Sequence, residues 1–319
     1  MLRSILIYLS QANWARQIVT RWSFARKVAS RFIAGEELDD ALNVVKALNA
    51  NNINATLDHL GEHTSNPEKA LRAADDIIAI IERIHQEGVR SGVSIKLTQI
   101  GLDVDESLCE ENLDRILEIA HRLSIFVRID MEDSQWVDKT LQIFSQALEK
   151  FGSETIGIVL QSYLYRTKDD LTNLLAAGAR IRMCKGAYAE PEEIAFPDKA
   201  DVDANFDQLV DLMFEGCTRN GTPLISDNGR IPPIPAIASH DEERIIFSKR
   251  LVEQRELPKQ AVEYQMLHGI RRDLQESLAS EGYPVRVYVP YGSEWYPYFT
   301  RRLAERPANL WFFISNLFR

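Results

Sequence analysis

Several charged residues stand inside or directly after short apolar runs that have the composition of buried strands. Lys96 lies within VSIKLTQ, Asp130 within VRIDMED and Arg182 within IRMCKGAY. A buried charge is costly unless opposite charges or hydrogen bonds compensate it, so we expect these three side chains to meet where acids and bases act together. For any single residue, the alternative is that the charge simply lies in a solvated loop. This alternative is least favoured for these three residues, because strand-forming residues flank them closely.

Other apolar runs also end in polar groups, as expected of a site to which every element contributes. Such an arrangement suits an active site at one end of an apolar core. The polar groups at or near the ends of the remaining runs are Asp58, His59, Glu132, Asp133, Gln161, Lys185, Ser239, His240, Asp241, Glu263, Gln265, Arg286 and Tyr288.

A second candidate group follows the last run. Tyr298, Arg301 and Arg302 are spaced i, i+3 and i+4 and so share one helical face, and Glu305 lies four residues after Arg301. Paired guanidinium groups suit a small carboxylate, to which each can donate two hydrogen bonds. The alternative is an exposed basic helix face. The neighbouring apolar residues Trp295, Phe299 and Leu303 favour a packed location.

The elements that would position these groups alternate regularly along the chain. Short strand-like runs are separated by stretches with helical periodicity, such as Pro67–Glu87, Leu108–Arg122, Trp136–Phe151 and Lys168–Leu175. This alternation predicts an α/β fold with a parallel sheet, and eight units in one domain predict a TIM-type (β/α)₈ barrel. A doubly wound open sheet is the alternative. The eight runs are Asn54–Leu60, Val93–Gln99, Ile125–Met131, Ile156–Gln161, Arg180–Lys185, Ile234–His240, Ala261–Leu267 and Val285–Pro290.

One segment does not follow this alternation. Thr222–Pro235 (TPLISDNGRIPPIP) is rich in turn-forming residues, and its proline pair interrupts regular structure. We interpret it as a loop leading into the sixth strand, in which Thr222–Ser226 could form an extra short strand.

Charge is unevenly distributed along the chain. The 319 residues carry a net charge of -10, which argues against a nucleic-acid partner. Residues 1–35 nevertheless contain six basic residues and no acid, leaving -16 for the remainder. Their apolar residues recur three or four apart, as in a basic amphipathic helix. We therefore predict an N-terminal helical arm, residues 1–45, and a barrel domain, residues 46–319. The arm would lie on an anionic membrane or pack within the protein or an oligomer.

Familiar nucleotide and metal motifs are missing from the sequence. It contains no GxGxxG, GxxxxGK[ST], HExxH or CxxC. The three cysteines, Cys109, Cys184 and Cys217, fit neither a disulfide framework nor a zinc site and indicate reduced thiols in a cytoplasmic protein. A metal-assisted barrel hydrolase using His59 and His240 is an alternative, but nearby Lys and Arg charges would oppose a divalent cation. We expect no metal.

Six ordered segments spanning about residues 53–310 resemble the monofunctional bacterial proline dehydrogenases and the corresponding domain of bifunctional proline-utilisation proteins. The resemblance implies a distorted (β/α)₈ barrel that holds FAD at the carboxyl ends of its strands, with the last helix over the barrel mouth. The segments are VSIKLTQIGLD, RIDMEDS, RIRMCKGAY, ASHD, VEYQMLHGI, and RVYVPYG followed by YFTRRLAERPAN.

The resemblance also implies residue roles. Arg301 and Arg302 would bind the proline carboxylate with help from Lys96, while Tyr288 and Tyr298 would wall the pyrrolidine ring. Glu305 would hold Arg301. Asp130, Arg182 and Tyr288 would form the catalytic group, with Arg182 near flavin N5 and Asp130 either a base or an orienting acid. The residues implied to contact FAD are Met131, Gln161, Arg182, Lys185, Gly186, Ala187, Ser239, His240 and Gln265.

The implied reaction is oxidation of L-proline to Δ1-pyrroline-5-carboxylate, the first step of proline catabolism, with electrons passing from FAD to a membrane quinone. A separate pyrroline-5-carboxylate dehydrogenase would consume the product. Hydroxyproline is the alternative substrate, and Tyr298 is expected to crowd its ring hydroxyl. The chain would be cytoplasmic, attached to the inner face of the membrane if the arm binds there. The pattern departs from the family at Ser239, where Thr is common, and in a longer Ser226–Pro235 segment that bears on the nearby flavin contacts.

Overall fold

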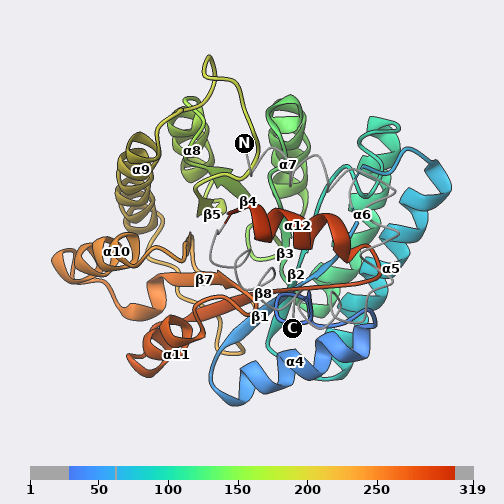
Figure 1. The fold of residues 1–319 in the computed structure, drawn as a ribbon, viewed down its shortest axis with the longest axis horizontal. Helices are drawn as coiled ribbons and strands as arrows, with labels where there is room; N and C mark the ends of the chain where they lie inside the picture. Colours follow the sequence, from blue (N-terminus) through green and yellow to red (C-terminus); the bar gives the residue numbers. More distant parts are fainter. Residues whose placement is uncertain (1–28, 62, 306–319) are drawn as a thin grey trace, which may run out of the picture.

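Eight parallel strands close into a barrel in which each strand pairs with its neighbours in sequence (Figure 1). The structure is a computed structural model that describes residues 29–61 and 63–305, with side chains up to residue 300. All eight predicted strands are confirmed, and the doubly wound alternative is wrong because β8 pairs with β1. The strands are β1 (Asn54–His59), β2 (Ser91–Ile95), β3 (Val127–Ile129), β4 (Ile156–Gln161), β5 (Arg180–Cys184), β6 (Pro235–Ala238), β7 (Glu263–Leu267) and β8 (Val285–Tyr291).

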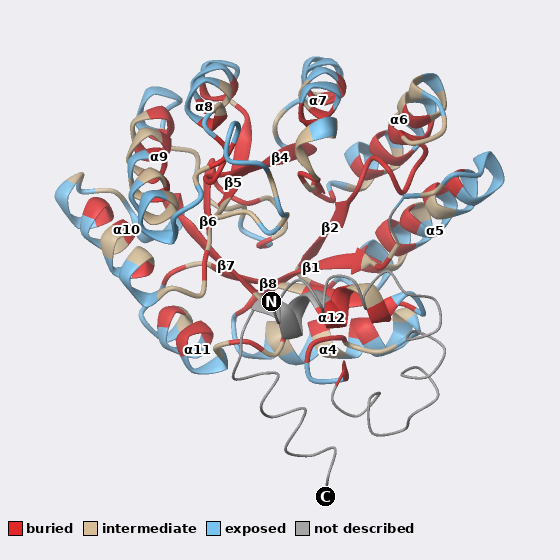
Figure 2. Ribbon diagram, turned by 45° about the horizontal axis from the view of Figure 1, so that its top comes forward, coloured by how far each residue is buried: buried red, intermediate tan, exposed pale blue. Residues whose placement is uncertain are grey.

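Helices surround the barrel and turn their apolar faces towards it (Figure 2). In α5, for example, Ile77, Ile81 and Ile84 recur at helical spacing and are all buried. The four helices predicted by range are confirmed. The helices are α4 (Leu38–Ala50), α5 (Pro67–Gln86), α6 (Glu106–Leu123), α7 (Val137–Phe151), α8 (Thr167–Ala176), α9 (Lys199–Arg219), α10 (Glu242–Gln254), α11 (Arg272–Ser280) and α12 (Trp295–Glu305), with short 3₁₀ turns η1 (Ser134–Trp136) and η2 (Lys259–Ala261).

The helix α4 packs against β1 and β8 and so covers the seam where the barrel closes. Ala41, Leu42 and Val45 on this helix are buried in the main core. The predicted boundary between arm and barrel, after residue 45, therefore falls within a helix whose apolar face belongs to the barrel. Most of the predicted arm, residues 1–28, lies outside the described part of the chain.

The helix α12 lies across the barrel opening at the carboxyl ends of the strands (Figure 1). Trp295 and Phe299 are buried in a separate apolar cluster that also contains Phe32 and Leu60. This packing confirms the predicted location of the last helix over the barrel mouth. It also explains why the apolar residues of this helix are spaced three and four apart.

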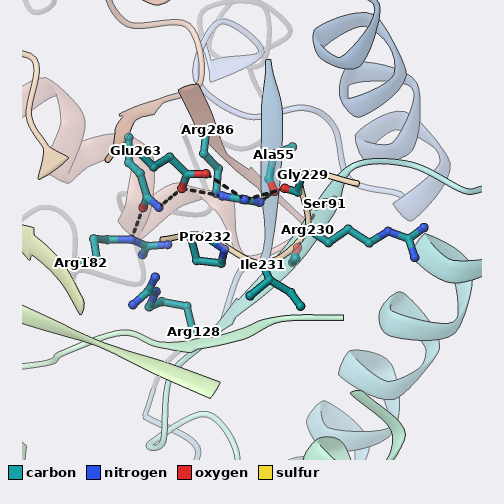
Figure 3. Close-up of polar contacts among 12 residues, drawn as sticks. Ala55, Ser91, Arg128, Arg182, Gly229, Arg230, Ile231, Pro232, Glu263 and Arg286 are labelled. Carbon is teal, nitrogen blue, oxygen red and sulfur yellow. Dashed lines mark hydrogen bonds and ion pairs between the residues drawn. The ribbon is translucent and has the colours of Figure 1, made fainter. Parts of the chain in front are cut away.

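The segment between α9 and β6 covers the opposite, amino-terminal end of the barrel (Figure 3). Arg286 Nη2 donates to the Gly229 carbonyl over 2.7 Å, and Arg230 Nε donates to the Val89 carbonyl, just before β2, over 3.1 Å. The possible strand at Thr222–Ser226 is wrong: the Ile225 N–H donates over 2.9 Å to the Gln260 carbonyl, which belongs to the 3₁₀ turn η2 and not to a strand. Because the segment lies away from the carboxyl ends of the strands, its length does not alter the place where the predicted flavin contacts would lie.

Candidate functional site

A cavity of about 630 Å³ opens at the carboxyl ends of the strands, beneath α12. Its volume lies within the usual range for small-molecule and cofactor sites. Every predicted site residue whose side chain is described lines this cavity: Lys96, Asp130, Met131, Gln161, Arg182, Lys185, Gly186, Ala187, Ser239, His240, Gln265, Tyr288 and Tyr298. Parallel strands explain the convergence, because their carboxyl ends meet at one end of the barrel.

The paired arginines of the predicted carboxylate site belong to α12. Arg301 and Arg302 follow Tyr298 by three and four residues on this helix, and Tyr298 lines the cavity. Their side chains, like that of Glu305, lie outside the described part of the chain.

Arg182 on β5 is held by hydrogen bonds on three sides. Its Nη1 donates to Asp130 Oδ1 over 2.7 Å, its Nη2 to Ser94 Oγ over 3.1 Å, and its Nε to Gln265 Oε1 over 2.5 Å. Its guanidinium carbon lies 5.5 Å from the centre of the Tyr288 ring. These contacts fix the plane of the guanidinium group, so its positive charge has one orientation towards the cavity.

Asp130 uses both carboxylate oxygens. In addition to the bond from Arg182, Asp130 Oδ2 accepts a hydrogen bond from the Tyr288 hydroxyl over 2.8 Å and lies 3.8 Å from Lys96 Nζ. Burial and the neighbouring Asp130 raise the pKa of Tyr288 well above its ordinary value. Tyr288 is therefore a neutral phenol that donates to Asp130, and the pair acts as one rigid unit.

Lys96 joins Asp130 to a second buried acid on β1. Lys96 Nζ donates to Asp58 Oδ1 over 3.1 Å. Burial raises the pKa of Asp58, while the charge of Lys96 opposes that rise. Asp58 lines the cavity but was not among the predicted site residues, although its position near the end of the first strand indicated it.

A group of alternating charges lies at the side of the cavity formed by β5, β6 and α9. Lys185 Nζ contacts Asp203 Oδ1 at 2.5 Å and Asp241 Oδ2 at 2.6 Å. Burial is the largest single influence and would raise the pKa of each carboxyl, but the hydrogen bond from Lys185 and the charges of Lys185 and Lys199 together outweigh it and lower both pKa values. Asp203 was missed by sequence reasoning, because it lies within a helix and no local pattern marks it as a partner of Lys185.

Several features of the cavity suit the predicted flavin. Gln161 is buried, and its Oε1 receives no hydrogen bond within the described residues, so it is available to an N–H donor on a ligand. Gly186 lines the cavity with a φ of +109°, and only glycine allows the Tyr163 ring to pack against this part of the cavity wall, because a Cβ there would collide with the ring. His240 Nε2 accepts from the Leu267 N–H over 2.9 Å, which places a proton of the neutral ring on Nδ1.

The chain has the architecture of a TIM-barrel enzyme, because its closed (β/α)₈ barrel carries fixed acids and bases at the carboxyl ends of the strands. No cluster of three or more potential metal ligands occurs within residues 29–61 and 63–305. No helix in the described part of the chain is long and apolar enough to span a membrane.

Comparison with known proteins identifies the family. Residues 41–314 match the family model described as proline dehydrogenase, and the chain belongs to this family. Proline dehydrogenase 1 of Bacillus subtilis (strain 168) is 38% identical over 319 residues, covering all of both chains. Proline dehydrogenase of Deinococcus radiodurans is 43% identical over 295 residues, covering 92% of this chain and 90% of its own. The predicted family is confirmed, and the alternative of a metal-assisted hydrolase is not supported.

Solved structures show the same fold. Proline utilization A from Bdellovibrio bacteriovorus, inactivated by N-propargylglycine, matches with a TM-score of 0.79 at 24% identity, covering 88% of this chain and 33% of its own. A Bradyrhizobium japonicum proline utilization A mutant (D778Y) matches with a TM-score of 0.71 at 21% identity, covering 91% of this chain and 31% of its own. This chain thus spans about one third of these longer proteins.

Proposed function

We propose that this chain oxidises L-proline to Δ1-pyrroline-5-carboxylate with FAD as its bound cofactor. The observation that carries the proposal is the oriented Arg182 at the centre of a cavity of cofactor size, in a chain of the proline dehydrogenase family. When bound, FAD supplies the acceptor for the hydride that leaves the ring carbon of proline. The carbon–nitrogen double bond of the product would form as the amine lone pair replaces that hydride, and the amine proton would pass to solvent water.

The cofactor would be held from β3 round to β7. Gln161 would accept an N–H of the ring system through its Oε1, and Gly186 would contact the cofactor from the cavity lining. Arg182 would face the part of the flavin where negative charge develops, because a preorganised cation stabilises that charge without reorganising. The remaining proposed contacts are Met131, Lys185, Ala187, Ser239, His240 and Gln265.

The substrate would bind between the cofactor and α12. Arg301 and Arg302 would hold the proline carboxylate, with Lys96 contributing from the barrel, and Tyr288 and Tyr298 would wall the ring. This arrangement positions the amine face rather than supplying strong acid–base power.

Asp130 would act as an orienting acid rather than as a base. Both of its oxygens already accept hydrogen bonds, from Arg182 and from Tyr288. Taking a proton from the substrate would remove the negative charge that strengthens the bond from Arg182. The geometry therefore favours the orienting role over the basic one.

After the reaction, the electrons and the product must pass to other partners. We propose a membrane quinone as the electron acceptor, a separate pyrroline-5-carboxylate dehydrogenase as the consumer of the product, and attachment to the membrane surface through the basic arm. Residues 1–28 of that arm lie outside the described part of the chain, so its basic amphipathic sequence is the support.

Two experiments test these assignments. Incubation with L-proline and a soluble quinone should yield product that reacts with o-aminobenzaldehyde, and absence of that product would overturn the proposed reaction. Arg301→Ala should weaken proline binding by roughly 2–4 kcal/mol through loss of a charge-assisted pair. Arg219→Ala, a change at a surface arginine paired with Glu215, is the matched control. A KM for Arg301→Ala within about twofold of the control would refute the carboxylate assignment.

A further inference from the structure

A buried ion pair lies in the barrel interior behind Arg182 and does not line the cavity. Glu263 on β7 is fully buried, with no exposed surface, and Arg286 on β8 is 3% exposed. Arg286 Nε donates to Glu263 Oε1 over 2.8 Å, and Nη2 donates to Oε2 over 3.0 Å. Desolvation makes a buried ion pair a poor source of stability compared with apolar packing. Its presence here calls for a role other than holding the fold together.

Arg286 is itself fixed by the backbone. Its Nη1 donates to the Ala55 carbonyl on β1 over 2.7 Å, and its Nη2 donates to the Gly229 carbonyl in the segment that covers the barrel floor, also over 2.7 Å. The guanidinium group therefore contacts three parts of the chain besides its own strand. Because Arg286 donates to both oxygens of Glu263, the fixed guanidinium group also fixes the carboxylate.

Gln265 connects the ion pair to the cavity. Its Nε2 donates to Glu263 Oε1 over 2.5 Å, and its Oε1 accepts from Arg182 Nε over 2.5 Å. A carboxylate paired with a guanidinium can only accept, and a guanidinium can only donate. The amide of Gln265 therefore has a single orientation that satisfies both neighbours. Figure 3 shows Arg286, Glu263 and Arg182 in series across the barrel interior.

We propose that Glu263 is a positioning residue for the reaction: by fixing the amide of Gln265, it fixes the orientation of Arg182 towards the cofactor. This inference rests on the proposed function, because it takes Arg182 as the cation beside the flavin. With Nε held by Gln265, the two terminal nitrogens of Arg182 are left for Asp130 and Ser94. All three bonds are formed before substrate arrives.

Replacing the carboxylate with an amide tests the inference. In Glu263→Gln either orientation of the new amide turns its NH₂ group towards a donor of Arg286, so the contact with Arg286 must change. Where the NH₂ group replaces Oε1, it donates to Gln265 Oε1, and Gln265 reverses and turns its own NH₂ group towards Arg182 Nε. Two donors would then face each other, and Arg182 would shift. We expect the rate of flavin bleaching at saturating proline to fall on the order of 10–100-fold, as a misplaced group can cause. The proline concentration giving half the maximal rate should change less than twofold.

A second readout needs no substrate. Bound FAD in Glu263→Gln should be harder to reduce in a dye-coupled titration, because a displaced Arg182 stabilises the reduced form less. A tenfold change in that two-electron equilibrium corresponds to about 30 mV. A merely structural role for Glu263 would lower the unfolding temperature and leave the potential of the folded, flavin-loaded fraction unchanged.

A double-mutant cycle tests whether Glu263 acts through Gln265. Gln265→Met removes the connecting amide, and adding Glu263→Gln to it should cause less than a twofold further loss of bleaching rate. Arg128→Met is the control for loss of an interior charge: Arg128 donates to the Ile158 and Arg180 carbonyls, and no bond to Glu263 or Gln265 occurs within the described contacts. It should retain the wild-type response to Gln265→Met.

The experiment remains decisive if Glu263→Gln does not fold. Glu263→Gln with Arg286→Met removes both charges of the pair together, so neither partner is left buried without the other. This double variant should fold and show the same slow bleaching. Wild-type bleaching rate and potential in either folded variant, or losses that simply multiply in the cycle, would overturn the inference. Wild-type protein that binds FAD but does not bleach with proline would instead refute the proposed function, and the substrate-free potentials would still test the role of Glu263.

Discussion

Replacement of Asp130 with asparagine is the change whose effect the geometry of the site specifies most closely. The substitution keeps the shape of the side chain but removes its charge and replaces one acceptor oxygen with an NH₂ donor. Because Arg182 can only donate, the orientation that keeps its 2.7 Å contact turns the new NH₂ group towards the Tyr288 hydroxyl, which can accept, and towards Lys96 Nζ, a donor 3.8 Å away. The reverse orientation loses the contact with Arg182 altogether. In both orientations the charged bond between Asp130 and Arg182 is lost.

The magnitude follows from that contact. A hydrogen bond to a charged group contributes about 1.5–3 kcal/mol. If the bond orients Arg182 in the transition state, its loss slows the reaction roughly 10- to 150-fold. The Tyr288 contact is preserved in one amide orientation, so the effect should not exceed this range greatly. Lys96 remains paired with Asp58, so the protein should fold.

The assay is stopped-flow bleaching of the flavin under anaerobic conditions, with rates normalised to bound flavin. Asp114→Asn is the matched control, since Asp114 pairs with Lys150 on the surface. A slower limiting rate with little change in half-saturating proline would support the orienting role. A limiting rate for Asp130→Asn within about threefold of the control would refute the reasoning, because the lost bond should slow the reaction at least roughly tenfold.

Three further predictions concern other residues. Tyr298→Ser should improve hydroxyproline relative to proline, and an unchanged ratio of the two kcat/KM values would count against crowding by Tyr298. Burial and the nearby Arg272 lower the pKa of His268 to about 4. Between that value and the ordinary pKa of about 6.5, the folded protein therefore binds fewer protons than the unfolded chain. The free energy of unfolding should fall by roughly 2 kcal/mol from about pH 7 to about pH 5. Urea unfolding at the two pH values measures this fall, and His268→Gln should reduce it. Burial raises the pKa of Cys109 to about 12 and that of Cys217 to about 11, so alkylation of folded protein at about pH 8 should modify Cys184, which lines the cavity, and added FAD should slow it. Mass spectrometry showing modification at Cys109 or Cys217 first would contradict this prediction.

The fold was largely predictable from the sequence, because buried parallel strands are read as apolar runs. The ends of β4 and β5 agree with the predicted runs to within a residue. The possible strand at Thr222–Ser226 failed for a reason that local pattern does not reveal. Ile225 in that segment bonds to the 3₁₀ turn η2 and not to the edge of a strand.

The cavity lining was predictable for a different reason. Residues at strand ends must meet in a closed parallel barrel, so Lys96, Arg182 and Gln161 could be placed together without coordinates. Partners that depend on tertiary pairing could not be found in this way. Glu263 was noticed as a polar residue in a strand, but its link to Arg182 requires the position of Gln265 and Arg286.

The absorbance spectrum of the purified protein, recorded before and after anaerobic addition of L-proline, tests whether the chain binds a flavin that proline reduces. Pyrrolidine, which has the ring amine without the carboxylate, is the matched control. We expect flavin bands that bleach with proline and persist with pyrrolidine. A protein that binds no flavin when FAD is supplied, or flavin that stays oxidised in saturating proline, would contradict it.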